Sequence, residues 1–209
     1  MSIMETNRIN FSTVFPAIRR ARVSILAIAL TYLIAVLIGI SMVHMDVPFA
    51  LDARDNIVAK ANSSSDPTSK AMQNGQPLVA ALSDFTRNLF FGAIPSTLSG
   101  LGVAFPYPEA LYRGWVGGIV SVDGNHISRF TQSREAIYYI VTLVLQLIPY
   151  SLAGGVGVYL GLAYFRTHSG FRPAKWYELP RPEILDVARI YLIIIPLFFI
   201  ASLWEFLFR

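Results

Sequence analysis

The chain has 209 residues, of which 54% are hydrophobic and 14% charged, with no cysteine and a formal net charge of +4. Soluble domains carry about 25% charged residues, so this composition predicts a single all-α integral membrane domain over residues 1–209. The lack of cysteine excludes disulfides, a thiol nucleophile and a thiolate metal site. The basic residues lie beside apolar runs, as membrane topology requires, so we expect no nucleic-acid partner.

The first predicted membrane span covers residues 23–43. It is longer than the apolar part of a signal peptide and has no small-residue cleavage site after it, so we expect it to be retained. Arg19, Arg20 and Arg22 precede it and favour a cytoplasmic segment over residues 1–22. Pro16 is expected to begin a short interfacial helix whose arginines lie at the lipid head groups; the alternative is a plain topology signal.

Residues 44–76 form a polar loop, which this orientation places outside the cell. The spacing predicts an amphipathic surface helix over residues 47–61, followed by a flexible connection at residues 61–70. His44 and Met45 are weak candidate metal ligands, because imidazole and thioether groups suit copper. A metal site needs more ligands than this stretch supplies, so no metal or other cofactor is expected.

A second apolar region extends over residues 77–105, with a predicted bend at Pro95. Gly92, Ser96 and Gly100 recur every fourth residue and form a small-residue face. Two prolines that follow are expected to break the helix over residues 105–113. The apolar stretch 114–122, which contains Gly114 and Gly118, is too short for an ordinary span; it is either re-entrant or a short third span covered by protein.

Residues 136–165 are an uncharged run longer than the roughly 20 residues that cross a bilayer. Pro149 predicts a kink or break about one turn before it. Gly154, Gly157 and Gly161 belong to a small-residue face in the second half, where another helix is expected to approach closely. The fold prediction is therefore a helix bundle with a proline-broken long span and glycine-rich contacts.

The basic loop 166–189 is predicted to be cytoplasmic, and the last span continues over residues 190–203. Glu205 lies near the outer end of this span, where we expect a structural contact to a neighbouring span. The count is about five crossings, with the N-terminus in the cytoplasm and the C-terminus outside. Without the crossing at 114–122, the two basic segments would fall on opposite sides of the membrane.

Four stretches, in this order, resemble motifs of the stage II sporulation protein M family. They are Phe85-x-x-Asn88, the glycine-rich segments 100–102 and 113–118, the run LAGGVGVYLG at 152–161, and Pro196 with Ala201 and Glu205. The chain departs from the family at Arg87, where an asparagine is common, at Arg113, which precedes Gly114 where the family commonly has Asn-Gly, and at Tyr150 and Ser151. There the family commonly has a histidine and a glycine followed by a glutamate.

The resemblance implies a prokaryotic cytoplasmic-membrane protein that acts as a non-catalytic scaffold or accessory subunit of a larger complex, with other membrane proteins and lipids as partners. The family's namesake is similar to an organiser that recruits cell-wall hydrolases during engulfment.

We expect no enzyme, because no lysine-bearing phosphate loop is present and no Ser-His-Asp set can be placed on a shared surface. The alternative is a transporter component with Gln146 and Thr142 at a broken helix. The predicted helix-packing or partner-binding residues are Gly92, Gly100, Gly114, Gly118, Gly154, Gly157, Gly161 and Glu205.

Overall fold

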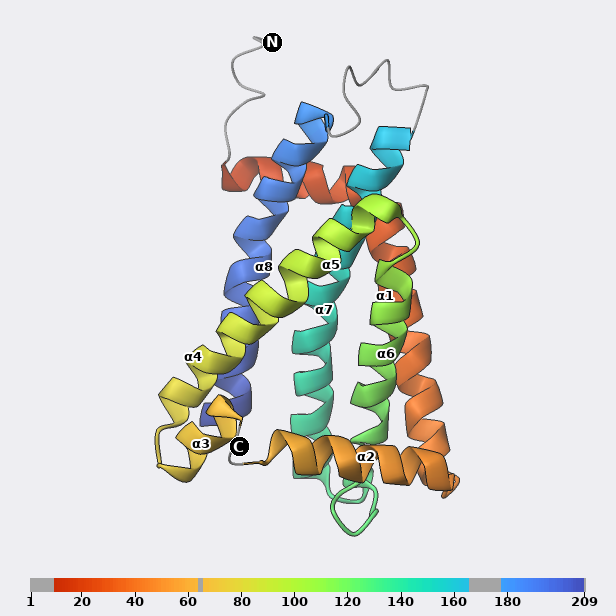
Figure 1. Cartoon of the computed structure of the whole chain (residues 1–209), viewed down its shortest axis with the longest axis vertical. Helices are drawn as coiled ribbons and strands as arrows, with labels where there is room; N and C mark the ends of the chain where they lie inside the picture. The colour runs from red at the N-terminus through yellow and green to blue at the C-terminus, as the bar shows by residue number, and fades with distance from the viewer. Residues whose placement is uncertain (1–9, 64–65, 166–177, 209) are drawn as a thin grey trace.

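The computed structural model describes residues 10–63, 66–165 and 178–208 (Figure 1). Its elements are η2 (Phe11–Thr13), α1 (Val14–His44), α2 (Pro48–Ala61), α3 (Pro67–Gln73), α4 (Pro77–Asn88), η3 (Leu89–Ala93), α5 (Ile94–Ser99), η4 (Gly100–Gly102), α6 (Pro106–Ile119), η5 (Arg129–Thr131), α7 (Ser133–Phe165) and α8 (Arg181–Leu207). In these parts of the chain, the strand-like pairing is limited to one isolated bridge between Val122 and Ser128. The predicted all-α class is confirmed for the described residues.

In the part of the chain that the structure describes, three helices are long and apolar enough to cross a membrane. They are the stretch Phe11–His44 with a mean hydropathy of 2.7, Ser133–Phe165 with 1.7 and Arg181–Leu207 with 2.3. Large apolar side chains on their outer faces are exposed, as with Leu30 on α1 and Ile200 on α8. A bilayer would cover such side chains, so these helices are consistent with an integral membrane protein.

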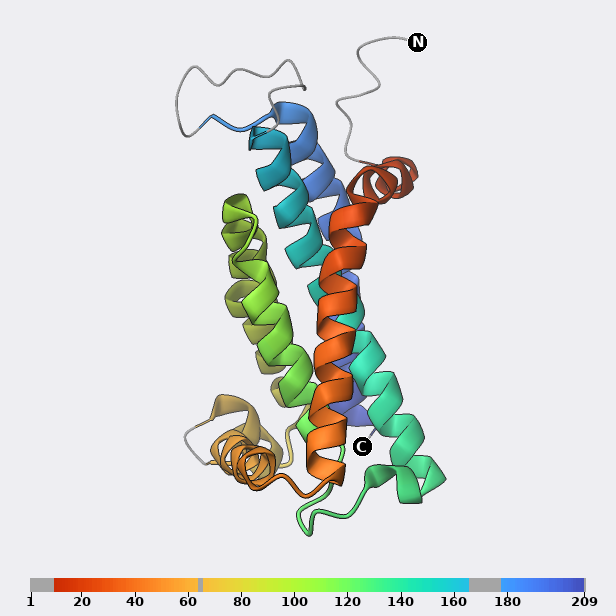
Figure 2. The same ribbon diagram turned by 90° about the vertical axis from the view of Figure 1, so that its right-hand side faces the viewer.

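The bundle is completed by two antiparallel helical segments (Figures 1 and 2). The first consists of α4, η3, α5 and η4 and runs diagonally from the end that carries α2 to the opposite end. The second is α6, which returns beside α1. The helix α4 packs against α8, and α5 and η4 pack against α7. The helix α7 therefore has neighbours on several sides and is buried continuously from residue 149 to 158.

The predicted break at Pro149 is wrong, because α7 is one 33-residue helix that contains this proline. Pro149 is fully buried between packed helices, and membrane helices tolerate proline where neighbouring groups compensate for the lost backbone bond. The irregular segment is α4–η4 instead. There Leu89–Ala93 form a π-helical turn, Pro95 follows in the first turn of α5, and a 3-10 turn ends the segment. A proline lacks the donor that would complete a regular α-helix, and the π-helical turn lies directly before the turn that contains Pro95.

Two further expectations are corrected. Pro106 and Pro108 begin α6 instead of leaving a break over 105–113, because the first helical positions need no intrahelical donor. The flexible connection expected at 61–70 overlaps α3, which starts at Pro67 with Asp66 capping the Ser69 amide at 3.0 Å. The surface helix predicted over 47–61 is confirmed as α2, which lies across one end of the bundle in Figure 1.

The short interfacial helix expected at Pro16 is part of a longer element. The helix α1 is continuous from Val14 to His44, although Figures 1 and 2 show that its first turns lie across the bundle end, at an angle to the remainder. Arg20 in these turns bonds Asp186 of α8 at 2.5 Å, so the beginnings of α1 and α8 share one end. The helices α2 and α3 and the C-terminal end of α8 lie at the other end.

Candidate functional site

The predicted glycine faces lie in close contacts within the chain. A Cβ added to Gly157 would come within 3.0 Å of the backbone of Thr97 in α5. One added to Gly100 would meet the backbone of Gly157, and one added to Gly161 would meet the carbonyl oxygens of Gly100 and Leu101. Real Cβ atoms essentially never approach other atoms this closely. The helix α7 therefore packs backbone to backbone on α5 and η4, in the manner that small residues permit.

A second close contact joins α1 and α6. Added Cβ atoms on Gly114 and Gly118 would lie within 3.0 Å of the carbonyl oxygens of Tyr32 and Val36. Gly92 instead lies against the ring of Tyr150. Gly154 has more room, with its nearest neighbour, Ser96 Oγ, 3.3 Å from the added atom. Most of the predicted glycines are thus covered by this chain's own helices.

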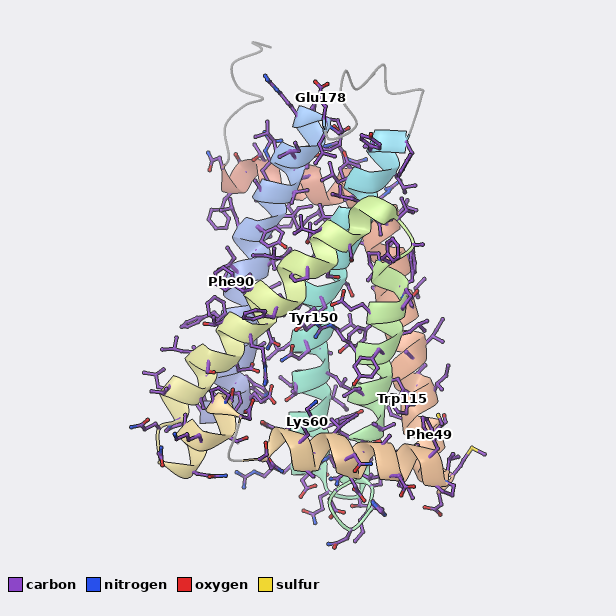
Figure 3. All side chains as sticks on the ribbon, viewed as in Figure 1. Phe49, Lys60, Phe90, Trp115, Tyr150 and Glu178 are labelled. Carbon is purple, nitrogen blue, oxygen red and sulfur yellow. The ribbon has the colours of Figure 1, made fainter. Side chains whose placement is uncertain are left out.

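Between α4 and α6, with α7 behind them, lies a cavity of about 350 Å³ that we call the polar groove. Its lining residues are Tyr32, Asp84, Arg87, Asn88, Tyr112, Arg113, Val116, Gly117, Val120, Tyr139, Thr142, Leu143, Gln146, Tyr150 and Glu205. Five helices contribute to this lining: α1, α4, α6, α7 and α8. Figure 3 shows Tyr150 between α4 and α6 near the middle of the bundle.

Asp84 joins α4 to α8 at the edge of the groove. Its side chain is 6% exposed and accepts hydrogen bonds from Arg87 Nη2 at 2.9 Å, Asn88 Nδ2 at 2.8 Å and Ser202 Oγ at 2.9 Å. Arg87 also reaches Asp66 at 3.1 Å. Asp84 and Arg87 are three positions apart on one helix, a spacing that brings their side chains together, whereas Ser202 adds a contact that spacing along the chain cannot indicate.

A chain of polar contacts crosses the groove at Tyr150. The phenol of Tyr150 donates to Asn88 Oδ1 at 2.9 Å, and the Arg113 guanidinium lies 4.1 Å from the centre of the Tyr150 ring. Arg113 Nε in turn donates to Glu109 Oε1 at 3.0 Å. A guanidinium over an aromatic face is an attractive cation–π contact. These polar contacts hold α4, α7 and α6 together at the level of Tyr150.

Glu205 lies at the same groove and contacts α7. Gln146 Nε2 is 3.5 Å from Glu205 Oε2, and the Tyr138 phenol donates to the Glu205 backbone carbonyl at 2.9 Å. Nearby, Trp204 Nε1 donates to Thr142 Oγ1 at 3.2 Å. The two polar residues that the sequence suggested for a mid-membrane site, Gln146 and Thr142, both line the groove.

Tyr150 and Arg113 were not predicted as site residues from the sequence, where Arg113 is only a position in a glycine-rich motif. An arginine between apolar residues was the available signal, because ionisable residues inside membrane segments are costly and often functional. The motif residues Asn88, Arg113 and Glu205, which are far apart in the chain, are brought together in this one groove.

His44 and His126 make hydrogen bonds at the end that carries α2. Both ring nitrogens of His44 have partners, Ile40 O at 2.8 Å and Ser128 Oγ at 2.7 Å. His126 bonds Asp55 at 2.9 Å. Met45 is 75% exposed. Within residues 10–63, 66–165 and 178–208, no group of three or more His, Cys, Asp or Glu residues gathers in a metal-binding arrangement.

The helix α2 is anchored on this end by aromatic and ionic contacts. Phe49 stacks on Trp115 with ring centroids 5.7 Å apart, and Figure 3 shows the two side chains together. Arg54, 5% exposed, donates to Asp55 Oδ1 at 2.8 Å and to the Val122 carbonyl at 3.4 Å. Hydrogen bonds from Arg54 and then His126 lower the pKa of Asp55 below its ordinary value of 3.8.

Asp55→Asn should therefore loosen α2 from the loop that carries His126. Since the folded-state pKa of Asp55 is lowered, its carboxylate stays charged at neutral pH and loses its charge only as the pH falls below 3.8. Hydrogen exchange of residues 48–61, corrected for the intrinsic rate, should be faster in Asp55→Asn than in the parent at pH 7. In the parent, exchange should rise only below pH 3.8. Asp52→Asn, an exposed neighbour on α2, is the control; equal exchange in both variants would contradict the anchoring role.

Comparison with known proteins finds no family model, no curated protein and no solved structure that matches this chain.

Proposed function

We propose that the chain is a non-catalytic membrane scaffold or accessory subunit, and that its polar groove receives a membrane-spanning helix of a partner protein. The observation that carries the proposal is the groove itself. Charged and amide side chains from Asp84, Asn88, Arg113, Gln146 and Glu205 meet there, in a bundle whose outer faces are apolar.

Polar side chains at this depth favour a protein partner over lipid. Lipid tails offer no hydrogen bonds, so polar groups in a membrane segment turn towards other helices or a water-filled cavity. Hydrogen bonds between membrane helices contribute about 0.6–2 kcal/mol each, enough for several of them to specify a partner. Tyr112 at the groove is 60% exposed, so the site is accessible from the side of the bundle.

The resemblance to the stage II sporulation protein M family supports the same role, since Asn88 and Glu205 of its motifs line the groove, together with Arg113, where this chain departs from the family. The proposal includes five crossings, with α4–η4 and α6 as the second and third. The ion pair between Arg20 and Asp186 supports an odd number of crossings, because three or five crossings, but not four, place both basic segments on one side. By the positive-inside rule that side is cytoplasmic, which leaves the 44–76 loop and the C-terminus outside.

Cysteine labelling tests this orientation in the cysteine-free chain. Ala61→Cys should react with an impermeant maleimide in intact cells, whereas Ser169→Cys, which lies outside the described residues, should react only after permeabilisation. The measurement is mass-tagging on a gel. The reverse pattern would overturn the orientation, and labelling of both positions from outside would overturn the count of five.

Photo-crosslinking tests the partner helix. With p-benzoylphenylalanine at Tyr112, we expect a discrete adduct to a second membrane protein whose crosslinked peptide, identified by mass spectrometry, maps to a membrane span. Leu30 on α1 is 57% exposed and outside the groove, so it is the matched control and should give no discrete adduct. The absence of an adduct at Tyr112, or the same adduct from both positions, would contradict the proposal.

A second candidate is transport of a polar solute through the groove. It is favoured by Gln146, which lies beside Glu205 on the groove surface. Flux of a cationic solute into proteoliposomes that is lost in Gln146→Leu and retained in Tyr112→Phe would establish this function in place of the scaffold.

A further inference from the structure

A separate cavity lies at the opposite end of the bundle from α2, between the first turns of α1 and the end of α7. Its volume is about 540 Å³. The lining residues, which define the basic cavity, are Pro16, Arg19, Arg20, Arg22, Val23, Ser24, Tyr159 and Leu162. It combines three guanidinium groups with an apolar wall, and none of its residues belongs to the polar groove.

The charges around the basic cavity are unbalanced. Asp186 of α8 is 2% exposed and accepts from both Arg20, at 2.5 Å, and the buried Arg189, at 2.9 Å. One carboxylate thus serves two arginines. Tyr159 of α7 also faces it, 3.4 Å away. Glu183, one turn earlier on α8, is half-buried and does not itself line the cavity, although its charge acts on Tyr159.

Arg19 and Arg22 add two positive charges to this cluster. Both are exposed, and neither makes an ion pair with any of the residues that the structure describes. The cavity therefore attracts an anion. Guanidinium groups suit phosphate in particular, because their planar donors match its oxygens in paired hydrogen bonds.

The apolar residues beside these arginines indicate the source of the phosphate. Phe15 is 76% exposed and Val23 72%, both on the same turns of α1 as the arginines. Val23 and Leu162 also form part of the cavity wall. Figure 2 shows that these turns of α1 leave the line of the bundle and lie across its end, as an interfacial segment does.

We propose that the basic cavity binds one anionic phospholipid. The phosphate of the headgroup lies among Arg19, Arg20 and Arg22, and the acyl chains descend along Val23 and Leu162. Such a site differs from a general attraction of basic residues to a charged membrane, because one lipid binds at one position. The other basic residues at this end of the bundle do not contact that lipid.

The test is native mass spectrometry of the purified full chain in detergent, with dioleoylphosphatidylglycerol and dioleoylphosphatidylcholine as probes. We expect one retained phosphatidylglycerol and no comparable retention of phosphatidylcholine. The double variant Arg19→Gln/Arg22→Gln should weaken retention by at least about tenfold, since two charge-assisted contacts are removed. Arg181→Gln and Arg129→Gln, combined in one chain, remove the same charge outside the cavity and should leave retention unchanged.

Three results would overturn the proposal: equal retention of the two lipids, an equal loss in the control variant, or full competition by soluble glycerol 3-phosphate at matched concentration. The second would mean that only overall charge matters, and the third that the site takes a free phosphate compound. Each variant is first compared with the parent by thermal unfolding in detergent alone, and single Arg22→Gln replaces the double variant if the latter is unfolded.

Discussion

Gly157→Ala should lower the thermal stability of the protein in detergent, whereas Gly154→Ala, three residues earlier on α7, should not. The added Cβ at Gly157 would lie within 3.0 Å of the Thr97 backbone, which has no flexible atoms to move aside. At Gly154 the nearest atom is a serine hydroxyl oxygen 3.3 Å away. Overpacking of a tight contact costs about 1–3 kcal/mol, while alanine favours a helix over glycine by about 1 kcal/mol.

The pair is a matched test because the chemical change and the helix are the same. Gly157→Leu should have a still larger effect. Leu160→Ala is unsuitable as a lipid-facing control. Leu160 is only 6% exposed, so its truncation would leave a cavity inside the bundle. The melting temperature of each variant is measured from the protein that remains folded after heating, monitored by size-exclusion chromatography. Equal melting of Gly157→Ala and Gly154→Ala would show that α7 and α5 are not closely packed.

Asp186→Asn should destabilise the bundle by about 3–5 kcal/mol, the typical cost of removing one partner from a buried ion pair. The Asp186 carboxylate joins α8 to α1 by accepting hydrogen bonds from Arg20. It also accepts from Arg189, which is 5% exposed. Neutralising Asp186 leaves the Arg189 charge without that compensation in a region of low dielectric. Thermal unfolding in detergent measures the effect.

Arg20→Gln is the control for Asp186→Asn. The Arg20 side chain is 48% exposed, so solvent screens its ion pair and its loss should cost about 1 kcal/mol or less. The double variant Asp186→Leu/Arg189→Met removes both buried charges and should be more stable than Asp186→Asn. If Asp186→Asn melts like the parent, the buried charges are compensated from elsewhere and the junction of α1 and α8 does not depend on them.

Much of the fold is predictable because it depends on local sequence. Apolar runs of sufficient length predict α1, α7 and α8, since a helix satisfies its own backbone groups whatever surrounds it. The amphipathic spacing predicts α2 for the same reason. The small-residue faces of Gly100, Gly157 and Gly161 could be read from four-residue spacing, because that spacing places residues on one side of a helix.

The tertiary structure decides the features that depend on which helices are neighbours. Pro149 does not interrupt α7, because helices packed on all sides hold it in place, while the irregular turn falls at Leu89–Ala93. The polar groove also escapes prediction: Asn88, Arg113, Tyr150 and Glu205 are separated by tens of residues and meet only when four helices assemble. The sequence by itself determines which segments are apolar helices and which faces are small, because both are local properties. The pairing of those faces, and the polar site between them, arise only from contacts between distant segments.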